Sequence, residues 1–403
     1  MPGTHPKVDT AIAWETARSR AAARPAPAPV RRPLAGARGA VLAAPLRARS
    51  DLPACDTAAM DGYAVAGPGP WTVVGRVLAG RCGPRQLSLG EAAEIATGAP
   101  VPYGTAAVLP YERATRTGDE VGGLAVPGRH VRRRGEECAA GTEVLPAGAV
   151  LTPTALGLAA SLGHDAVTVR PRPRVVALIT GDEIVSSGPS GPGRTRDAVG
   201  PVLPGLVEWA GGIFASPVHV PDTRAAMSAA LSEAARPAPP GGPADPAGPS
   251  GADVVAVAGA SSRGPADHVR GALRDAGAEL LVEGVACRPG HPQLLAALPG
   301  GPLVVGLPGN PFAALAAALT LLVPALDALT GRARAAERAR PACALPAHPH
   351  DTRLVPVRRT ADGVVPVGHD RPALLWGAAT ADALAVVPAG GAGADVELLR
   401  LPG

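Results

Sequence analysis

The sequence predicts a multidomain chain that combines an α/β domain with β-rich modules. Buried-type apolar runs alternate with helix-like segments between about 171 and 332, which favours a parallel α/β sheet. Short apolar pieces between Gly and Pro turns fill residues 51–145 and return after about 335, which favours small β domains. A chain of 403 residues allows two to four domains, each able to bury a core.

Composition favours a globular protein that binds a small anion. The sequence is 46% hydrophobic and 18% charged, with a formal charge of +4. Aromatic residues make up only 2% and no basic run has aromatic partners, so nucleic-acid binding is not expected. Lys7 is the only lysine and lies outside any Gly-Lys-Ser/Thr pattern, which excludes a Walker A loop and a Schiff-base lysine.

The cysteines and the apolar runs favour a cytoplasmic protein. The five cysteines are far apart and form no Cys-x-x-Cys pair, which argues against a zinc site or a disulfide framework and fits a reducing compartment. No signal peptide is recognised. The apolar run 312–326 is shorter than a membrane span and is expected to be a core helix, so no membrane association is expected.

The elements are expected in this order. A helix lies within 8–24, and the Pro/Ala stretch 25–34 ends it before a second short helix within 35–50. The first β-rich region contains strands at 71–74, 93–96, 106–109 and 123–126, and a helix at 154–162 and a strand at 166–169 follow. The α/β region contains strands at 174–179, 214–220, 253–258 and 303–306 and helices at 200–210, 223–236 and 312–329. Residues 237–252 form a surface insertion, and the last strands lie at 354–358, 364–367, 383–387 and 396–401.

The stretch from Cys55 to Val65 is the strongest candidate for a functional segment. It holds the carboxylates Asp56 and Asp61, and Asp61-Gly62 is a turn pair that opens into a short apolar strand. A turn leaves the Asp61 carboxylate able to meet a cation or a hydroxyl. The alternative is that Asp61 only caps its own turn.

The loops that leave the predicted parallel strands carry glycines and acids. Ligands of an open parallel sheet lie beyond the carboxyl ends of its strands, where glycine permits close backbone approach and helix starts attract phosphate. The acids in these loops are Asp182, Glu183, Asp222 and Asp267. Together they favour a phosphate site with Mg²⁺, which takes few protein oxygens. The alternative for each acid alone is a helix N-cap.

Two further segments have the chemistry of anion binding. Arg132-Arg133-Arg134-Gly135-Glu136 brings guanidinium groups next to a glycine, although adjacent arginines are usually a solvated face. Asn310, the only asparagine in the chain, lies between Gly309 and Pro311 and offers both a donor and an acceptor. Its alternative role is to form a turn.

The segments Met60 to Tyr63, Thr97 to Pro102, Arg132 to Glu136, Thr180 to Glu183 and Gly306 to Pro311 together resemble the motifs of the molybdopterin molybdenumtransferase family. The resemblance covers essentially the whole chain. It implies an N-terminal linking domain (1–50 and 146–170), an inserted β-rich lever domain (51–145), a molybdopterin-binding α/β domain (171–332) and a C-terminal β domain (335–403). It also implies an elongated homodimer.

The resemblance implies that adenylylated molybdopterin and molybdate are the substrates, with Mg²⁺, and that AMP is released when molybdenum enters the dithiolene. The implied catalytic residues are Asp61, Asp222 and Asp267, and the implied metal ligands are these three and Glu183. The implied substrate-binding residues are Thr97, Arg133, Arg134, Thr180, Gly181, Glu183, Gly259, Ser261, Arg288, Pro308, Gly309, Asn310 and Pro311.

The chain departs from the family motifs at three places in the α/β domain. Gly-Gly-Val-Ser-Val-Gly appears as 259–264 with Ala260 and Arg263, Lys-Pro-Gly-Lys-Pro appears as 288–292 with Arg288 and His291, and Asp-(Ser/Thr)-Asn ends here in Val199. A β-carbon at Ala260 would crowd a ligand that needs bare glycine. The runner-up hypothesis is therefore a degenerate paralogue that binds molybdopterin or a partner without catalysis. The adenylyltransferase of the preceding step is a third reading, which ATP consumption would reveal.

Overall fold

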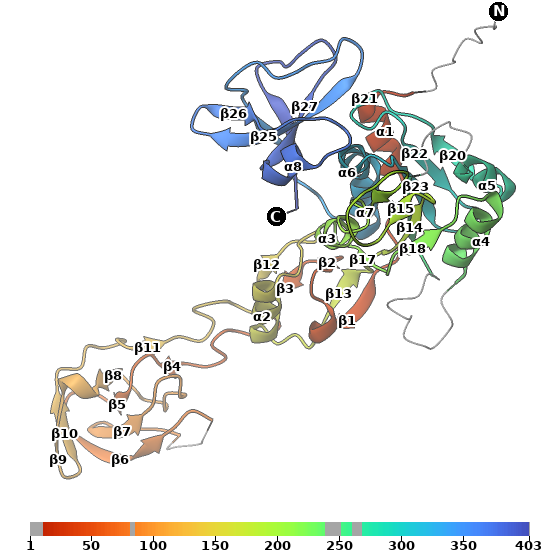
Figure 1. Cartoon of the computed structure of the whole chain (residues 1–403). Helices are drawn as coiled ribbons and strands as arrows, with labels where there is room; N and C mark the ends of the chain where they lie inside the picture. Colours follow the sequence, from red (N-terminus) through yellow and green to blue (C-terminus); the bar gives the residue numbers. More distant parts are fainter. Residues whose placement is uncertain (1–10, 81–84, 238–250, 260–267, 403) are drawn as a thin grey trace, which may run out of the picture. The chain divides into compact units, whose positions relative to one another are not determined.

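The computed structural model describes residues 11–80, 85–237, 251–259 and 268–402. The chain forms two compact units (Figure 1). Unit 1 comprises Met1–Val30, Gly39–Val41 and Arg170–Gly403, and unit 2 comprises Arg31–Arg38 and Leu42–Val169. The α/β and β combination expected from the sequence is confirmed, because unit 2 is rich in β-structure and unit 1 contains an α/β sheet and a second β sheet.

Unit 2 contains a sheet in the order β8-β5-β7-β6-β10-β9. Its strands are β5 (Gly62–Val65), β6 (Trp71–Val77), β7 (Glu91–Ile95), β8 (Ala107–Pro110), β9 (Ala114–Thr117) and β10 (Glu120–Gly123). Strand β5 lies between β7 and β8 and is buried along its whole length, with Ala64 on one apolar cluster and Tyr63 and Val65 on another. The motif strand after Asp61 is therefore the interior of this sheet. The prediction of a strand at 123–126 is wrong, because β10 ends at Gly123 and residues 124–126 form no strand.

The rest of unit 2 is built from short pairings. Strands β1 (Val30–Pro33), β13 (Ala166–Arg170) and β2 (Val41–Leu42) form one sheet, β3 (Leu46–Arg47) pairs with β12 (Glu143–Leu145), and β4 (Thr57–Ala58) pairs with β11 (Val131–Arg132). Helix α2 (Pro153–Ser161) begins at Thr152, whose hydroxyl accepts a hydrogen bond from the Ala155 amide.

The prediction of a short helix within 35–50 is wrong. The structure has only a 3₁₀ turn, η1 (Leu34–Gly36), followed by β2 and β3. The amides of Leu42 and Ala43 donate to the carbonyls of Ala149 and Thr168, so this segment takes its backbone partners from residues far along the chain. Tertiary pairing overrides the helix propensity of its many alanines here.

The α/β sheet of unit 1 has the order β17-β14-β19-β23-β22-β20, and β18 also pairs with β14. Strands β14 (Arg174–Thr180), β17 (Ile213–Phe214), β18 (Val218–Val220), β19 (Val254–Ala258) and β23 (Leu303–Leu307) are parallel, as expected. Strands β22 (Leu294–Ala297) and β20 (Glu279–Val282) continue the sheet antiparallel, so the whole sheet is mixed.

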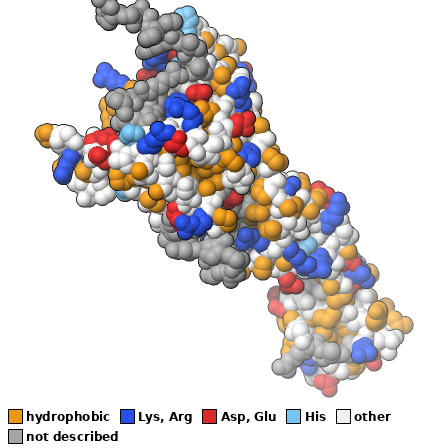
Figure 2. All heavy atoms as spheres, turned by 90° about the vertical axis from the view of Figure 1, so that its right-hand side faces the viewer, with side chains coloured by type: hydrophobic (Ala, Val, Ile, Leu, Met, Phe, Trp, Pro, Cys, Tyr) orange, Lys and Arg blue, Asp and Glu red, His pale blue; other side chains and the backbone are white. Residues whose placement is uncertain are grey.

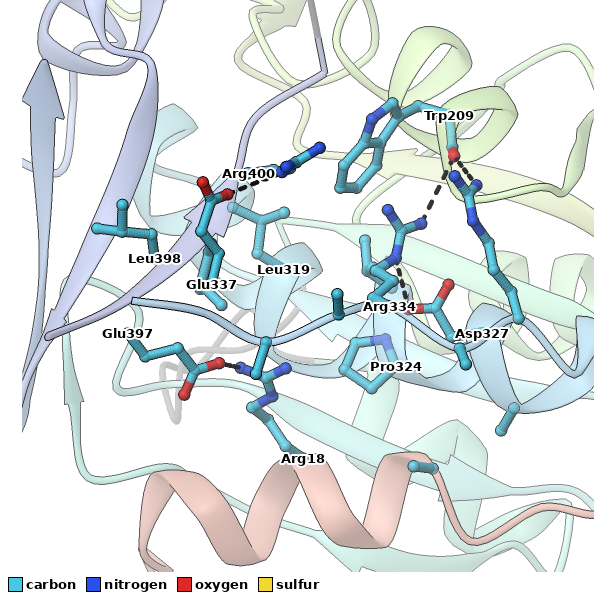
Figure 3. Close-up of a pocket in the computed structure, with 18 of the residues that line it drawn as sticks. Arg18, Trp209, Leu319, Pro324, Asp327, Arg334, Glu337, Glu397, Leu398 and Arg400 are labelled. Atoms are coloured by element: carbon cyan, nitrogen blue, oxygen red, sulfur yellow. Dashed lines mark hydrogen bonds and ion pairs between the residues drawn. The ribbon is translucent and has the colours of Figure 1, made fainter. Parts of the chain in front are cut away.

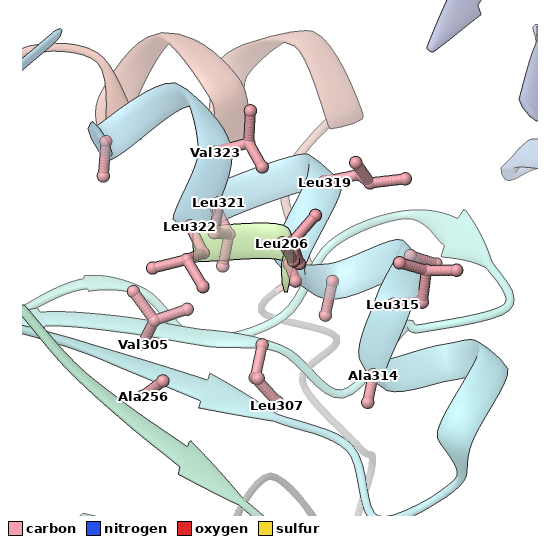
Figure 4. Close-up of a cluster of buried hydrophobic side chains, with 14 of the residues drawn as sticks. Leu206, Ala256, Val305, Leu307, Ala314, Leu315, Leu319, Leu321, Leu322 and Val323 are labelled. Carbon is pink, nitrogen blue, oxygen red and sulfur yellow. The ribbon is translucent and has the colours of Figure 1, made fainter. Parts of the chain in front are cut away.

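Side chains of the central strands alternate between two apolar clusters. Val175, Ala177 and Ile179 face a cluster that includes residues of α1 (Trp14–Ala21), α3 (Leu203–Trp209) and the long helix Pro311–Thr330. Figure 4 shows part of this cluster. Val176 and Leu178 face the cluster that includes α4 (Arg224–Ala235) and α5 (Val269–Asp275). Helices on both faces bury this sheet, which explains the continuous apolar runs in its strands.

The long helix runs through α6 (Pro311–Ala317), η3 (Ala318–Leu322) and α7 (Val323–Thr330). By length and composition alone it could cross a membrane, but 78% of its most apolar window is buried inside the protein. The Trp14 indole donates to the Thr320 hydroxyl over 3.1 Å, so α1 is joined to the buried middle of this helix. It is therefore a core helix, as expected.

A second sheet of unit 1 has the order β21-β25-β27-β28-β24, and β26 pairs with β25. Its strands are β21 (Cys287–Arg288), β24 (Glu337–Ala339), β25 (Thr352–Thr360), β26 (Gly363–Pro366), β27 (Ala383–Val387) and β28 (Val396–Arg400), with α8 (Trp376–Thr380) beside β25. Strand β21 precedes the others by many residues in sequence. It makes the segment that begins at Cys287 part of this sheet.

Candidate functional site

Two motifs of unit 2, Thr97 to Pro102 and Arg132 to Glu136, lie on either side of the stretch Cys55 to Val65. The Ala58 amide donates to the Ala99 carbonyl over 2.9 Å, and the Gly98 amide donates to the Ala58 carbonyl over 2.8 Å. On its other side, β4 pairs with β11, with Val131 opposite Ala58. The Asp61 stretch, the turn after Thr97 and the arginine segment therefore form one surface.

Asp61 is exposed and fixes the turn at Thr97. Its Oδ1 accepts hydrogen bonds from the Thr97 amide at 2.7 Å and from the Thr97 hydroxyl at 3.0 Å. Within the described residues, Oδ2 of Asp61 makes no hydrogen bond. The carboxylate thus stabilises a turn in another segment, with one oxygen left for a ligand.

Asp56, which the sequence did not single out as a site residue, holds the arginine segment. Its Oδ1 accepts from the Arg134 amide at 2.8 Å and its Oδ2 accepts from Arg133 Nη1 at 2.6 Å. The Arg134 amide and, next, the Arg133 guanidinium hold the Asp56 pKa below its usual range. Arg134 Nε also donates to Asp51. Both arginines are therefore already ion-paired. The presence of Asp56 beside Asp61 in the same stretch was the sequence feature that could have indicated a partner for an arginine.

The carboxyl ends of β14 and β18 bring together Asp222, a predicted metal ligand, Thr180, a predicted substrate-binding residue, and Asp182, one of the acids of the strand-end loops. Thr180 Oγ1 donates to Asp222 Oδ1 over 2.6 Å. The Asp182 amide donates to Asp222 Oδ2 over 3.3 Å, and the Asp222 amide donates to Asp182 Oδ1 over 3.2 Å. The reciprocal bonds hold both carboxylates at the sheet edge, where ligands of such sheets bind.

Glycines let the backbone pack closely at the strand ends that carry these carboxylates. Gly259 follows the end of β19 with φ +91°, and a Cβ there would lie 2.5 Å from the Thr180 carbonyl oxygen. A Cβ on Gly309 would lie 3.7 Å from the Gly259 Cα, so the two glycines face each other. Gly181 has φ +131°, and its missing Cβ would meet Glu183 Oε2 at 2.9 Å. Glu183 thus folds back towards Gly181.

The start of the long helix differs from the expected phosphate site. Pro311 has no amide hydrogen, and the amides of Phe312 and Ala313 donate to the Pro372 carbonyl over 2.9 and 3.4 Å. Asn310 is exposed and makes no side-chain cap bond, whereas Pro308 is buried. The amides that the sequence placed here for a phosphate are already used, and the Asn310 side chain and the Gly309 backbone remain.

The other predicted residues divide as follows. Arg288 lies on β21 and its guanidinium contacts Asp351. Val199, which stands at the family's asparagine position, is buried in the core, and Asp197 accepts from the Val199 and Gly200 amides at 2.9 and 2.8 Å. Asp267 and Ser261 lie outside the described residues. Asp61, Thr97, Arg133 and Arg134 belong to unit 2, and the remaining described candidates belong to unit 1.

The donor set at the sheet edge fits Mg²⁺ only together with a ligand. In the part of the chain that the structure describes, no group of three or more His, Cys, Asp or Glu side chains is placed to hold a metal ion. Asp182, Asp222 and Thr180 offer oxygen donors alone. Mg²⁺ typically takes one or two carboxylates and completes its shell with water and substrate phosphates, so this incomplete protein shell is compatible with it.

A separate pocket of about 950 Å³ lies in unit 1, away from these residues (Figure 3). Arg334 stacks on Trp209 at 3.8 Å from the ring centroid and donates to Asp327 over 2.6 Å. Burial raises the Asp327 pKa and lowers the Arg332 pKa.

On the face shown in Figure 2, basic side chains lie among acidic and apolar ones and form no continuous stripe.

Three family models match the chain in order. They are the MoeA N-terminal region (domain I and II) at residues 11–163, the probable molybdopterin binding domain at 176–328 and the MoeA C-terminal region (domain IV) at 338–401. Together they span both units, so the family resemblance drawn from the motifs is confirmed.

Relatives and solved structures agree. The chain is 36% identical to molybdopterin molybdenumtransferase 2 of Mycobacterium tuberculosis over 321 residues. This aligned region covers 75% of this chain and 76% of that protein. It is 33% identical to the molybdopterin molybdenumtransferase of Nostoc sp., over 74% of this chain and 69% of that one. A molybdopterin biosynthesis MoeA protein from Pyrococcus horikosii superposes with a TM-score of 0.75 at 26% identity, over 98% of this chain and 100% of that chain. The chain therefore belongs to the molybdopterin molybdenumtransferase family.

Proposed function

We propose that this protein is a cytoplasmic, Mg²⁺-dependent transferase that inserts molybdate into adenylylated molybdopterin and releases AMP. Family membership supports a role in molybdenum cofactor biosynthesis. The observation that carries the finer proposal is the sheet edge, where Gly259 and Gly309 face each other and the carboxylates of Asp182 and Asp222 each accept from the other residue's amide. Such an edge admits a pyrophosphate against the backbone and supplies oxygen ligands next to it.

In this proposal the residues divide the work between binding and charge control. Gly181, Gly259 and Gly309 let the phosphates approach the backbone, and Asn310 and Arg288 bind them. Asp222, oriented by Thr180, would hold Mg²⁺ together with Glu183, Asp61 and Asp267, and the ion would offset the charge on the pyrophosphate. Water attacks the phosphorus of the adenylyl group, the bond from that phosphorus to the bridging oxygen breaks, the bridging oxygen stays on the molybdopterin phosphate, and AMP leaves as one proton goes to solvent.

We further propose a homodimer in which Asp61 of one chain serves Asp222 and Asp267 of the other. The family resemblance motivates this arrangement, because a two-fold interface brings the same pair of surfaces together twice. Mixing Asp61→Asn with Asp267→Asn protein then restores about a quarter to a half of the sites in exchanged dimers. Failure to recover activity after proven subunit exchange would place the site within one chain.

The test of function is AMP release by the full chain with adenylylated molybdopterin, molybdate and Mg²⁺. Asp61→Asn keeps an Oδ1 that accepts both Thr97 bonds, so its melting temperature stays within a few degrees of the wild type. Because the charge is lost, the rate falls on the order of a hundredfold or more. Asp119→Asn is the matched control, since Asp119 is an exposed carboxylate of the same unit outside the motifs. Full activity of Asp61→Asn would end its catalytic assignment.

A second function, binding of molybdopterin without turnover, has its own support. Arg133 and Arg134 are ion-paired with Asp56 and Asp51, and Val199 is buried where the family motif has an amide. Wild-type protein that binds the adenylylated ligand but releases no AMP above background selects this alternative.

A further inference from the structure

Arg288 is held by a carboxylate from another part of the chain. Its Nε donates to Asp351 Oδ2 over 2.7 Å. The Asp351 side chain is only 13% exposed and Arg288 is 57% exposed, so a nearly buried acid holds a guanidinium that reaches into solvent. Within the described residues the terminal Nη atoms of Arg288 make no hydrogen bond, and they form the end of the fork that can bind a tetrahedral oxyanion.

The backbone around this pair is fixed from both sides. Strand β21 pairs with β25, with Cys287 opposite Thr352, and the Thr352 amide donates to the Ala286 carbonyl over 2.9 Å. On the acid side, the Asp351 amide donates to His348 Nδ1 over 3.0 Å. Neither partner of the ion pair can therefore shift far without breaking backbone contacts of the second sheet.

The arginine form of this segment makes the arrangement possible. An ammonium is a point charge on a flexible stem, whereas a guanidinium can give Nε to one carboxylate and keep two Nη groups for a second anion. The family motif has lysine at this position, and this chain has Arg288. Asp351 and Arg288 thus form an ion pair in the C-terminal sheet, in which the sequence predicted Arg288 as a site residue but not Asp351.

We propose that Asp351 is a positioning residue that orients Arg288 to bind a tetrahedral oxyanion, either the phosphate of the substrate or molybdate. The inference rests on the proposed function of Arg288 in substrate binding. A carboxylate that orients a ligand-binding group typically changes affinity at least tenfold in metal sites, and a similar effect on the order of tenfold is expected here.

The experiment titrates the full chain with AMP and, separately, with inorganic molybdate by calorimetry. Asp351→Asn lowers the affinity for one of the two probes about tenfold, and the probe whose affinity falls identifies the oxyanion that Arg288 binds. Asp351→Glu recovers part of that loss. The matched control is Asp370→Asn, because Asp370 accepts from Arg353 Nε over the same 2.7 Å in the same sheet region and lies outside the proposed contact. The control leaves both affinities unchanged.

A structural role is separated from positioning by the background variant Arg288→Lys. If Asp351 acts through the guanidinium, Asp351→Asn changes affinity less than twofold in that background. Equal losses in both backgrounds, an unchanged affinity, tighter binding by Asp351→Asn, or no binding of either probe to the wild type would each overturn the inference. Weakened binding by Asp351→Asn in a protein that releases no AMP would keep the inference and reject the proposed turnover.

Discussion

Gly259→Ala tests whether the close backbone packing at the sheet edge requires glycine. Gly259 has φ +91°, and the added Cβ would lie 2.5 Å from the Thr180 carbonyl oxygen, which belongs to the backbone of the neighbouring strand β14. A left-handed conformation costs a non-glycine residue roughly 1–2 kcal/mol. Forced overlap in packed structure adds about 1–3 kcal/mol, because the strand ends must move apart. The expected destabilisation is therefore about 3 kcal/mol.

The matched control is Gly300→Ala. Gly300 also has a positive φ, +59°, but a Cβ there meets nothing within 4 Å, so only the conformational cost of about 1 kcal/mol applies. For a domain of this size, 1 kcal/mol corresponds to about 2–4 °C in melting temperature. Differential scanning calorimetry should show a drop of roughly 6–12 °C for Gly259→Ala and about 2–4 °C for Gly300→Ala. Equal drops for the two variants would refute the steric argument.

Two further outcomes are expected. Gly309→Ala adds a Cβ whose nearest neighbour is 3.7 Å away, and the backbone of Gly309 does not have a positive φ. The melting temperature should therefore stay within a few degrees of the wild type while AMP binding weakens. Unchanged AMP binding would show that no ligand approaches this backbone. Tyr111→Phe removes the 2.7 Å hydrogen bond that is the largest cause of the lowered Glu94 pKa. The lowered pKa of Glu94 stabilises the folded protein at pH values above the unfolded pKa of about 4.3, and this stabilisation is lost as the pH falls through the folded pKa. Chemical denaturation should therefore show that Tyr111→Phe lowers the free energy of unfolding at pH 7, and that this loss shrinks near about pH 3. The same penalty at both pH values would contradict this linkage.

Much of the α/β region could be predicted because a strand that is buried on both faces of a sheet is a continuous apolar run in the sequence. Strands β14, β19 and β23 are continuous apolar runs, and the glycines and acids that follow them were expected at one sheet edge. The structure brings Thr180, Asp182 and Asp222 together there. The helix prediction for 35–50 is wrong because an alanine-rich composition favours a helix only where no distant segment accepts hydrogen bonds from its amides.

Several site contacts could not be predicted, since they join residues that no pattern relates. Asp56 and Arg133 are 77 positions apart, and each is an ordinary charge in its own segment. The Pro372 carbonyl at the start of the long helix is likewise invisible to a motif that ends at Pro311. Such contacts depend on how the sheets are placed within each unit, and local periodicity carries no such information.

The sequence by itself determined the family, the strand-and-helix order of the sheet and the set of glycines and acids beyond its strands, because these follow from local apolar period and motif wording. Only the tertiary structure decided that β22 and β20 run antiparallel, that β21 joins the C-terminal sheet, and that Asp351 holds Arg288 across 63 positions. Strand direction and ion-pair partners are chosen by packing and desolvation among distant segments, which act only once the chain has folded.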